Sequence, residues 1–273
     1  MNGYRMRFLP ALAILLGLFP HSQAAADLIP VHHPLATSLA FLVLRTLDGQ
    51  PIAYGNLKLV VEEKKELVVE DLQFRFKDGS FFEEITKFTQ HDVFRLISDQ
   101  VVQKGPSFKQ ESETFLDATT GNVMVRTVEK GKEKTSNKHL DLPPDVSNGL
   151  VLILAFNLDP SAAETTVSMV AASGPRVVKL NISPGQEKLF KTGAVTYHAQ
   201  HYVVKTKVQG VAGVVAPLIG KVPPDIHIWI LKSEAPAFME FEGPLSPDSP
   251  VWRIELASPE AEPAKEASPE KRP

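Results

Sequence analysis

Side chains that alternate between apolar and polar with a period of two residues run through most of this sequence and limit what it can fold into. In the stretch 68–76, Val68, Leu72, Phe74 and Phe76 share one parity, and the other positions are mostly polar. A β-strand places successive side chains on opposite faces of its sheet. The stretch therefore predicts a strand with one dry and one wet face, as in an antiparallel sheet.

Turn residues separate the alternating stretches at hairpin spacing. Asp78-Gly79, Thr120-Gly121-Asn122 and Lys130-Gly131 suit tight turns because these residue types tolerate a positive φ. Strands joined in this way are usually spatial neighbours, which favours a meander. The predicted strands are 68–76, 81–88, 93–102, 111–117, 123–130, 132–140, 165–172, 177–182, 194–208, 226–231, 238–241 and 251–256.

One segment changes to a helical period. Pro143-Pro144-Asp145 resembles a helix start with the aspartate as N-cap, and apolar residues follow at Val146, Leu150 and Ile153. This spacing predicts a helix over 145–157. A lone helix is best buried in the concave face of a sheet. We therefore predict a mainly β fold, a curved antiparallel sheet or half-open barrel with one helix packed against it.

The N-terminus has the three parts of a cleavable secretory signal peptide over residues 1–24. Arg5 and Arg7 precede an apolar run over 8–19, and a triplet with small residues at its first and third positions ends at Ala24. The apolar run is shorter than the roughly 20 residues that cross a bilayer. We predict cleavage near Ala24, a periplasmic or secreted protein, and no integral membrane span after cleavage.

The rest of the chain divides by composition. Residues 25–38 form an N-terminal lead, and 39–256 form a β-rich domain, either one unit or two β halves joined by the 145–157 helix. Residues 257–273 are rich in proline and charge and have no large apolar side chain. Such a segment cannot bury enough surface to offset its ordering entropy, so it is predicted to be a disordered tail.

Composition argues against several classes of function. The chain has no cysteine, which excludes disulfides, thiolate metal sites and a cysteine nucleophile. Its formal charge is −3, and its basic residues form no cluster, which argues against a nucleic-acid partner. His198 and His201 lie three apart in a predicted strand and so face opposite ways, which disfavours a shared metal. We predict no metal and no cofactor.

No motif assigns a catalytic residue. The segment 213–221 lacks the glycine spacing and the hydroxyl residue of a phosphate loop, and Gly-x-Ser-x-Gly is absent. Glu83-Glu84 and Glu62-Glu63 are adjacent in strands, so the two members of each pair face opposite ways, and solvated strand charge is the interpretation. A binding protein is favoured over an enzyme, with a hydrolase left open because a triad can assemble from distant residues.

The segment 208–224 is the most distinctive part of the sequence. It joins two predicted strands, yet it is apolar, glycine-rich and uncharged before Lys221. Loops normally lie in water, so its aliphatic side chains either face a cavity, a lipid or a partner, or fold back into the core. Trp229, in the next strand, is either a core residue or a ligand platform. The candidate ligand-binding residues are Val211, Val214, Val215, Leu218, Ile219 and Trp229.

Several segments carry a resemblance to known proteins, namely 68–84, 103–108, 117–123, 142–145, 148–150, 229–231, 236–238 and 252–254. In this order they resemble an uncharacterised family of exported bacterial β-rich proteins, periplasmic domains of unknown function. The layout is more distantly similar to lipoprotein carriers that hold acyl chains in a half-barrel. The resemblance implies a curved antiparallel sheet and names no catalytic residue.

These observations favour an exported envelope protein that binds an apolar or lipid-like ligand in a cavity of its curved sheet, with 208–224 at the mouth. The alternative is a protein-interaction or assembly module of the cell envelope, in which the same segment docks onto a protein partner. A hydrolase is the third hypothesis.

Overall fold

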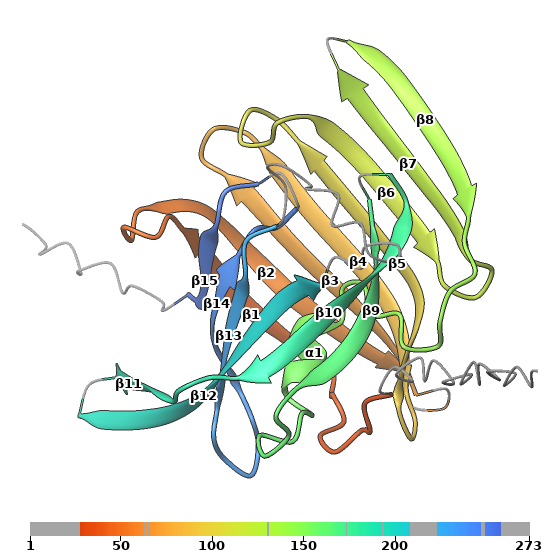
Figure 1. Cartoon of the computed structure of the whole chain (residues 1–273). Helices are drawn as coiled ribbons and strands as arrows, with labels where there is room; N and C mark the ends of the chain where they lie inside the picture. The colour runs from red at the N-terminus through yellow and green to blue at the C-terminus, as the bar shows by residue number, and fades with distance from the viewer. Residues whose placement is uncertain are drawn as a thin grey trace, which may run out of the picture.

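The computed structural model describes residues 28–62, 64, 66–129, 131–172, 174–192, 194–207, 223–246 and 249–257. These residues form strands and one short helix, α1 (Val151–Ala155), as Figure 1 shows. The strands are β1 (Ser38–Arg45), β2 (Pro51–Glu62), β3 (Leu67–Phe76), β4 (Phe81–Gln90), β5 (Phe94–Lys104), β6 (Glu111–Asp117), β7 (Asn122–Glu129), β8 (Lys132–His139), β9 (Thr165–Ala171), β10 (Arg176–Pro184), β11 (Lys188–Thr192), β12 (Val195–Lys207), β13 (Ile226–Leu231), β14 (Phe238–Gly243) and β15 (Trp252–Leu256).

The strands belong to one curved antiparallel sheet of 15 strands, in the order β8-β7-β6-β5-β4-β3-β2-β1-β15-β14-β13-β12-β10-β9, with β11 paired to β12. The first eight are neighbours in space as in sequence, which confirms the meander for that part. β15 then pairs with β1, with Leu44 opposite Ile254. The end strands β8 and β9 do not pair with each other in the described part of the chain, so the sheet stays open. The prediction of a mainly β fold with a curved antiparallel sheet is confirmed.

β12 is long because it pairs with two different strands along the same edge. Its first half pairs with β11 and its second half with β10, where Ile182 lies opposite Val204. The chain changes from one partner to the other at Gly185, whose backbone N–H donates to the carbonyl of His201 over 2.8 Å. The β11–β12 hairpin extends beyond the rest of the sheet in Figure 1.

The inner, concave face of the sheet carries the core. One buried cluster gathers around α1 and includes Val68, Phe88 and Ile228 from three strands. A second cluster is aromatic and surrounds Phe108, whose ring lies 6.1 Å from that of Trp252 in an edge-on arrangement. Burial of large aromatic rings provides much of the stabilisation in β cores, which accounts for Trp252 in this position.

The helix is shorter than the predicted 145–157. The first part of the predicted segment is not helical, because Gly149 takes a φ of +70°, outside the right-handed helical region. Asp145 caps no helix: its carboxylate accepts from Ser168 Oγ (2.8 Å) and pairs with Lys179 Nζ (3.2 Å). The segment before α1 therefore lies along β9, and only Val151–Ala155 completes a helical turn inside the curved sheet.

This segment covers the exposed edge of β9. Val146 forms a parallel bridge with Ser168. Asn148 then acts like a strand residue through its side chain, whose Oδ1 accepts from Val170 N (2.8 Å) while its Nδ2 donates to Val170 O (3.0 Å). Unpaired strand edges are sites of unwanted association, so this cover protects an end of the open sheet.

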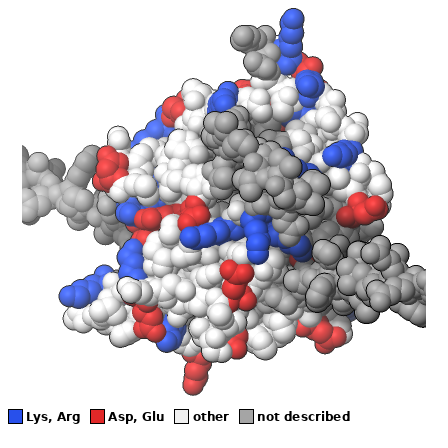
Figure 2. All heavy atoms as spheres, in the orientation of Figure 1, with Lys and Arg blue, Asp and Glu red and all other residues white. Residues whose placement is uncertain are grey.

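On the face shown in Figure 2, Lys and Arg lie among Asp and Glu. The predicted signal peptide over 1–24, most of the 257–273 tail and the apolar part of 208–224 up to 222 lie outside the described residues.

Candidate functional site

The inner face of β3, β4 and β5 carries a row of polar side chains at its centre. Strand register places Glu70 opposite Thr86, and Thr86 opposite Asp99. All three are buried, with at most 5% of their surface exposed. The Thr86 hydroxyl donates to Asp99 Oδ1 over 3.1 Å. Two carboxyl groups therefore flank one hydroxyl in the interior of the sheet.

Glu84 joins this row, which corrects the interpretation of Glu84 as a solvated strand charge. It lies two residues before Thr86 on β4, hence on the same face, opposite Leu72 and Val101. The side chain is half-buried, and it lines two cavities that are partly open to solvent. Its neighbour Glu83 faces the other way, as the alternation predicts, so the relevant partners of Glu84 are on other strands. We call Glu70, Glu84 and Asp99 the carboxyl cluster.

A β-bulge in β5 explains why sequence analysis missed Asp99. Phe88 pairs with Leu96, but the preceding Lys87 pairs with Ser98, so β5 contains an extra residue at this point. The extra residue changes the parity of the strand. Leu96 and Asp99 therefore both face inward although they lie three apart. A strict two-residue period starting from Leu96 puts Asp99 outside, and no local signal in the sequence marks the bulge.

Burial sets the protonation of the carboxyl cluster. It raises the pKa of Glu70 to about 8, and the nearby Asp99 carboxyl adds to the rise. Burial also raises the pKa of Asp99 to about 7, against the hydrogen bond from Thr86 that lowers it. The pKa of Glu84 is raised by burial and by its two acidic neighbours. Removing a carboxylate from water disfavours its charged form, so at neutral pH the cluster retains protons.

An apolar cavity of about 230 Å³ lies beside the carboxyl cluster on the inner face. Glu70 and Glu84 are its acidic lining residues, and the rest of the lining is apolar or uncharged. Strands from both halves of the sheet and the helix contribute to its wall. The apolar wall includes Leu57, Leu72, Leu152, Leu180, Ile226 and Phe241.

A second cavity, of about 420 Å³, adjoins the first and is more polar. The two share Glu84, Gly149, Met169, Leu245 and Ser246 in their linings. Strand pairing places the inward-facing residues of β5, β6, β7 and β8 side by side across the sheet, and together they form the polar wall. This wall includes Asp99, Gln103, Thr114, Thr127, Lys134 and Ser136.

Of the six predicted site residues, the structure describes Trp229, which lines neither of these cavities. Val211, Val214, Val215, Leu218 and Ile219 lie outside the described residues.

Trp229 lies on the opposite face of the sheet. Its neighbours Ile228 and Ile230 join the inner core, and its ring stacks on His201 with a centroid distance of 4.6 Å. The Lys188 ammonium lies 4.5 Å from its ring centroid. Trp229 is buried by these outer-face neighbours.

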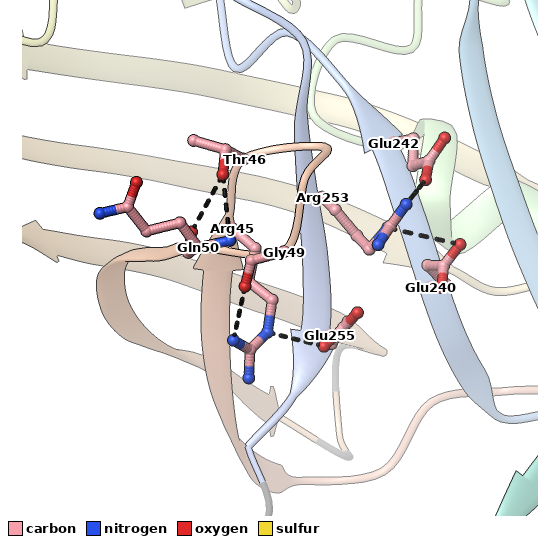
Figure 3. A network of polar contacts seen from close by, with 8 residues as sticks. All are labelled: Arg45, Thr46, Gly49, Gln50, Glu240, Glu242, Arg253 and Glu255. Carbon is pink, nitrogen blue, oxygen red and sulfur yellow. Dashed lines mark hydrogen bonds and ion pairs between the residues drawn. The ribbon is translucent and has the colours of Figure 1, made fainter.

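Figure 3 shows a polar network on this outer face. The buried Glu240 accepts from Lys188 Nζ over 2.6 Å and lies 3.8 Å from the guanidinium of Arg253. Arg253 also pairs with Glu242 at 2.6 Å, and Arg45 pairs with Glu255 at 3.0 Å. Partly buried pairs of this kind join neighbouring strands. The network is separate from the cavities because alternation puts it on the other side of the sheet.

A serine, a lysine and an aspartate also meet near β9. Lys179 Nζ donates to Ser168 Oγ over 2.7 Å, and Ser168 Oγ donates to Asp145 Oδ2. Ser168 has no exposed surface, and it lines neither of the two cavities. A nucleophile must reach its substrate, so this cluster serves to tie β9, β10 and the Asp145 segment together.

The strand pairing and the two cavities define a β-rich protein with an open, curved sheet and a hollow inner face. No family model matches the sequence, and no curated protein matches it either. Among solved structures, the chain is similar to the crystal structure of a beta-barrel-like protein of domain of unknown function DUF1849 from Brucella abortus. The two chains share 10% sequence identity and superpose with a TM-score of 0.45. The alignment covers 83% of this chain and 100% of the Brucella chain.

No helix in the described ranges has both the length and the apolar character needed to cross a membrane. Among the same residues, no group of three or more His, Asp or Glu side chains is arranged to hold a metal ion.

Proposed function

We propose that the protein binds an apolar or lipid-like ligand in the two adjoining cavities of its inner face. The observation that carries this proposal is the joining of an apolar cavity to a polar one through shared lining residues, with the carboxyl cluster at the boundary. Ligand sites are typically concave and mostly apolar with a few placed polar groups. The two cavities together match that description.

The shape of the site favours an amphiphile. An alkyl chain gains free energy by leaving water for the apolar cavity, at about 0.8 kcal/mol for each buried CH₂ group. A polar head would occupy the second cavity, where side-chain hydroxyls and amides offer hydrogen bonds. Because Glu84 and Met169 line both cavities, a single ligand can extend from one into the other.

Export of the protein from the cytoplasm is part of the same proposal. The signal-peptide features of residues 1–24 support export to the periplasm or secretion. A protein there that binds acyl chains would meet lipids of the cell envelope, which agrees with the resemblance to exported β-rich proteins.

Mass spectrometry of the protein purified from a native host tests the proposal. Under native conditions we expect a co-purifying lipid that is released on denaturation. Added dodecyl amphiphiles should displace a fluorescent fatty-acid probe. Protein that carries no lipid and binds neither this probe nor a dodecyl amphiphile would refute the proposed function.

A cavity-blocking variant locates the binding. Met169→Trp should fill space shared by both cavities and weaken probe binding by about tenfold or more, a loss of roughly 1.4 kcal/mol. The matched control is Leu189→Trp, because Leu189 is 57% exposed on β11 and lines neither cavity. Equal probe affinity in the two variants, with native circular dichroism, would place the ligand elsewhere.

A further inference from the structure

Two buried oxygen atoms beside the cavities lack a hydrogen-bond donor. They are Glu70 Oε2 and Gln103 Oε1. Glu70 is 5% exposed and lines the apolar cavity, and Gln103 is 7% exposed and lines the polar one. Gln103 Oε1 is an acceptor, and Glu70 Oε2 is one when the Glu70 carboxyl group is ionised. A buried polar atom without a partner is costly, so these two atoms indicate what a ligand should supply, namely N–H or O–H groups.

The charges around the carboxyl cluster point the same way. The helix and strands β9, β10 and β12 to β15 contribute no titratable side chain to the described lining of the apolar cavity. Lys109 and Lys134, the basic groups that line the polar cavity, are exposed residues. No cation within the described lining of the apolar cavity therefore faces Glu70 and Glu84.

We infer that the ligand is an amphiphile whose head carries a protonated amine, placed against Glu70, Glu84 and Asp99, with its alkyl chain in the apolar cavity. This inference rests on the proposed function and specifies the head group. An alkylammonium brings three N–H donors and one positive charge, which match unpaired acceptors and acidic groups. A fatty-acid carboxylate would instead bring further acceptors and a negative charge, the sign that Glu70 and Glu84 carry when they are ionised.

Binding should be coupled to protons. In the empty site the cluster retains protons at neutral pH, because burial holds the pKa of Glu70 at about 8 and that of Asp99 at about 7. An ammonium nearby favours the ionised form of a carboxyl group and so lowers its pKa. The amine should therefore release protons as it binds, and its affinity should rise between pH 6 and 8.5, below the usual amine pKa of about 10.4. Glu84, Lys109 and Lys134 are the other titratable groups facing these cavities.

The test compares dodecylamine, dodecanol and dodecanoic acid, which share one chain, as competitors of a fluorescent probe on the full-length protein. We expect dodecylamine to bind about tenfold more tightly than dodecanoic acid at pH 8, with an affinity that rises with pH. Calorimetry in two buffers of different ionisation enthalpy should show proton release.

Two variants separate the contribution of the ligand's head group to binding from that of its alkyl chain. Glu70→Gln and Glu84→Gln keep the shape of each side chain and should each weaken dodecylamine by about tenfold while changing dodecanol by less than about twofold. Glu187→Gln, at a site far less buried, is the matched control and should change neither.

The outcomes are distinguishable. If none of the three compounds displaces the probe, the proposed function itself fails. If dodecanoic acid or dodecanol binds as tightly as dodecylamine, or if the amine loses affinity as pH rises from 6 to 8.5, the head-group inference alone is overturned.

Discussion

Glu70 shows how one buried carboxyl group links the cavity to the stability of the sheet. Its pKa is raised to about 8 because burial disfavours the ionised form. A group whose pKa is higher in the folded than in the unfolded state stabilises the fold at low pH. That stabilisation is complete below the unfolded pKa of 4.5 and is lost as pH rises through 8. The carboxyl cluster therefore makes the protein less stable in alkaline solution.

We predict that the free energy of unfolding falls between pH 6.5 and 8, by about 2 kcal/mol from Glu70 alone. Glu70→Gln should remove that part of the slope, and denaturant unfolding at several pH values would measure it. His201 contributes the opposite slope only below its ordinary pKa of 6.5, because burial and His227 lower its pKa. A Glu70→Gln protein with the same slope as the natural protein would contradict this account of burial.

On the outer face, Lys188 supports Glu240, a carboxylate whose side chain is only 7% exposed. We predict that Lys188→Met destabilises the protein by about 1–3 kcal/mol, because Glu240 loses its closest charge partner inside the sheet. Lys232→Met is the matched control: Lys232 pairs with the more exposed Glu187, and its loss should cost about 0–1 kcal/mol. Chemical denaturation compares the two. A larger effect at Lys232 would contradict the proposed importance of Glu240.

Among the elements, the turn before α1 depends on one glycine. Gly149 has a φ of +70°, and a Cβ atom there would lie 2.0 Å from the Thr86 hydroxyl of the polar row. This close approach brings the segment before the helix down onto β4. Because Gly149 also lines both cavities, the same contact shapes the candidate site.

We predict that Gly149→Ala destabilises the protein by more than about 2 kcal/mol and weakens probe binding, since it adds a steric clash to backbone strain. Gly79→Ala is the matched control. Gly79 also has a positive φ, of +88°, but a Cβ atom there would meet nothing within 4 Å, so only the strain of about 1–2 kcal/mol remains. Thermal unfolding of the two variants measures the difference, and equal losses would show that the contact with Thr86 is unimportant.

The strands and the helix also show which elements the sequence pattern predicts and which it does not. Alternation and glycine turns predicted β4, β6 and β13 closely, because local side-chain period and turn chemistry determine both. They did not predict the true start of α1, since the Asp145 carboxylate binds Lys179 from a distant strand instead of capping a helix. The carboxyl cluster was missed for a similar reason. Glu70 and Asp99 meet only through strand pairing, and a bulge reverses the parity of Asp99.

The whole molecule is an open sheet whose two end strands are joined through side chains and a connecting segment. Lys138 on β8 donates to the carbonyl of Pro175, in the turn between β9 and β10, over 2.7 Å. Asn148 covers the edge of β9 through Val170. These contacts hold the sheet in its curved form around the cavities without closing the hydrogen-bond ladder.

We predict that Asn148→Ala loosens this edge. The amide of Val170 would lose its acceptor, so its hydrogen exchange should accelerate, while the amide of Leu180 in the paired interior should change little. The expected loss of stability is about 1–2 kcal/mol. Unchanged exchange at Val170 would mean that the side chain of Asn148 does not protect the edge.

The central claim is that an amphiphile occupies the hollow inner face. Methyl NMR of the protein with a spin-labelled fatty amphiphile tests it directly, because a nearby unpaired electron broadens signals. We predict strong broadening at Leu72, Leu180 and Ile226, which line the apolar cavity, and sharp signals at the exposed Leu189 and Val195. Broadening confined to Leu189 and Val195, or spread evenly over the surface, would contradict the claim.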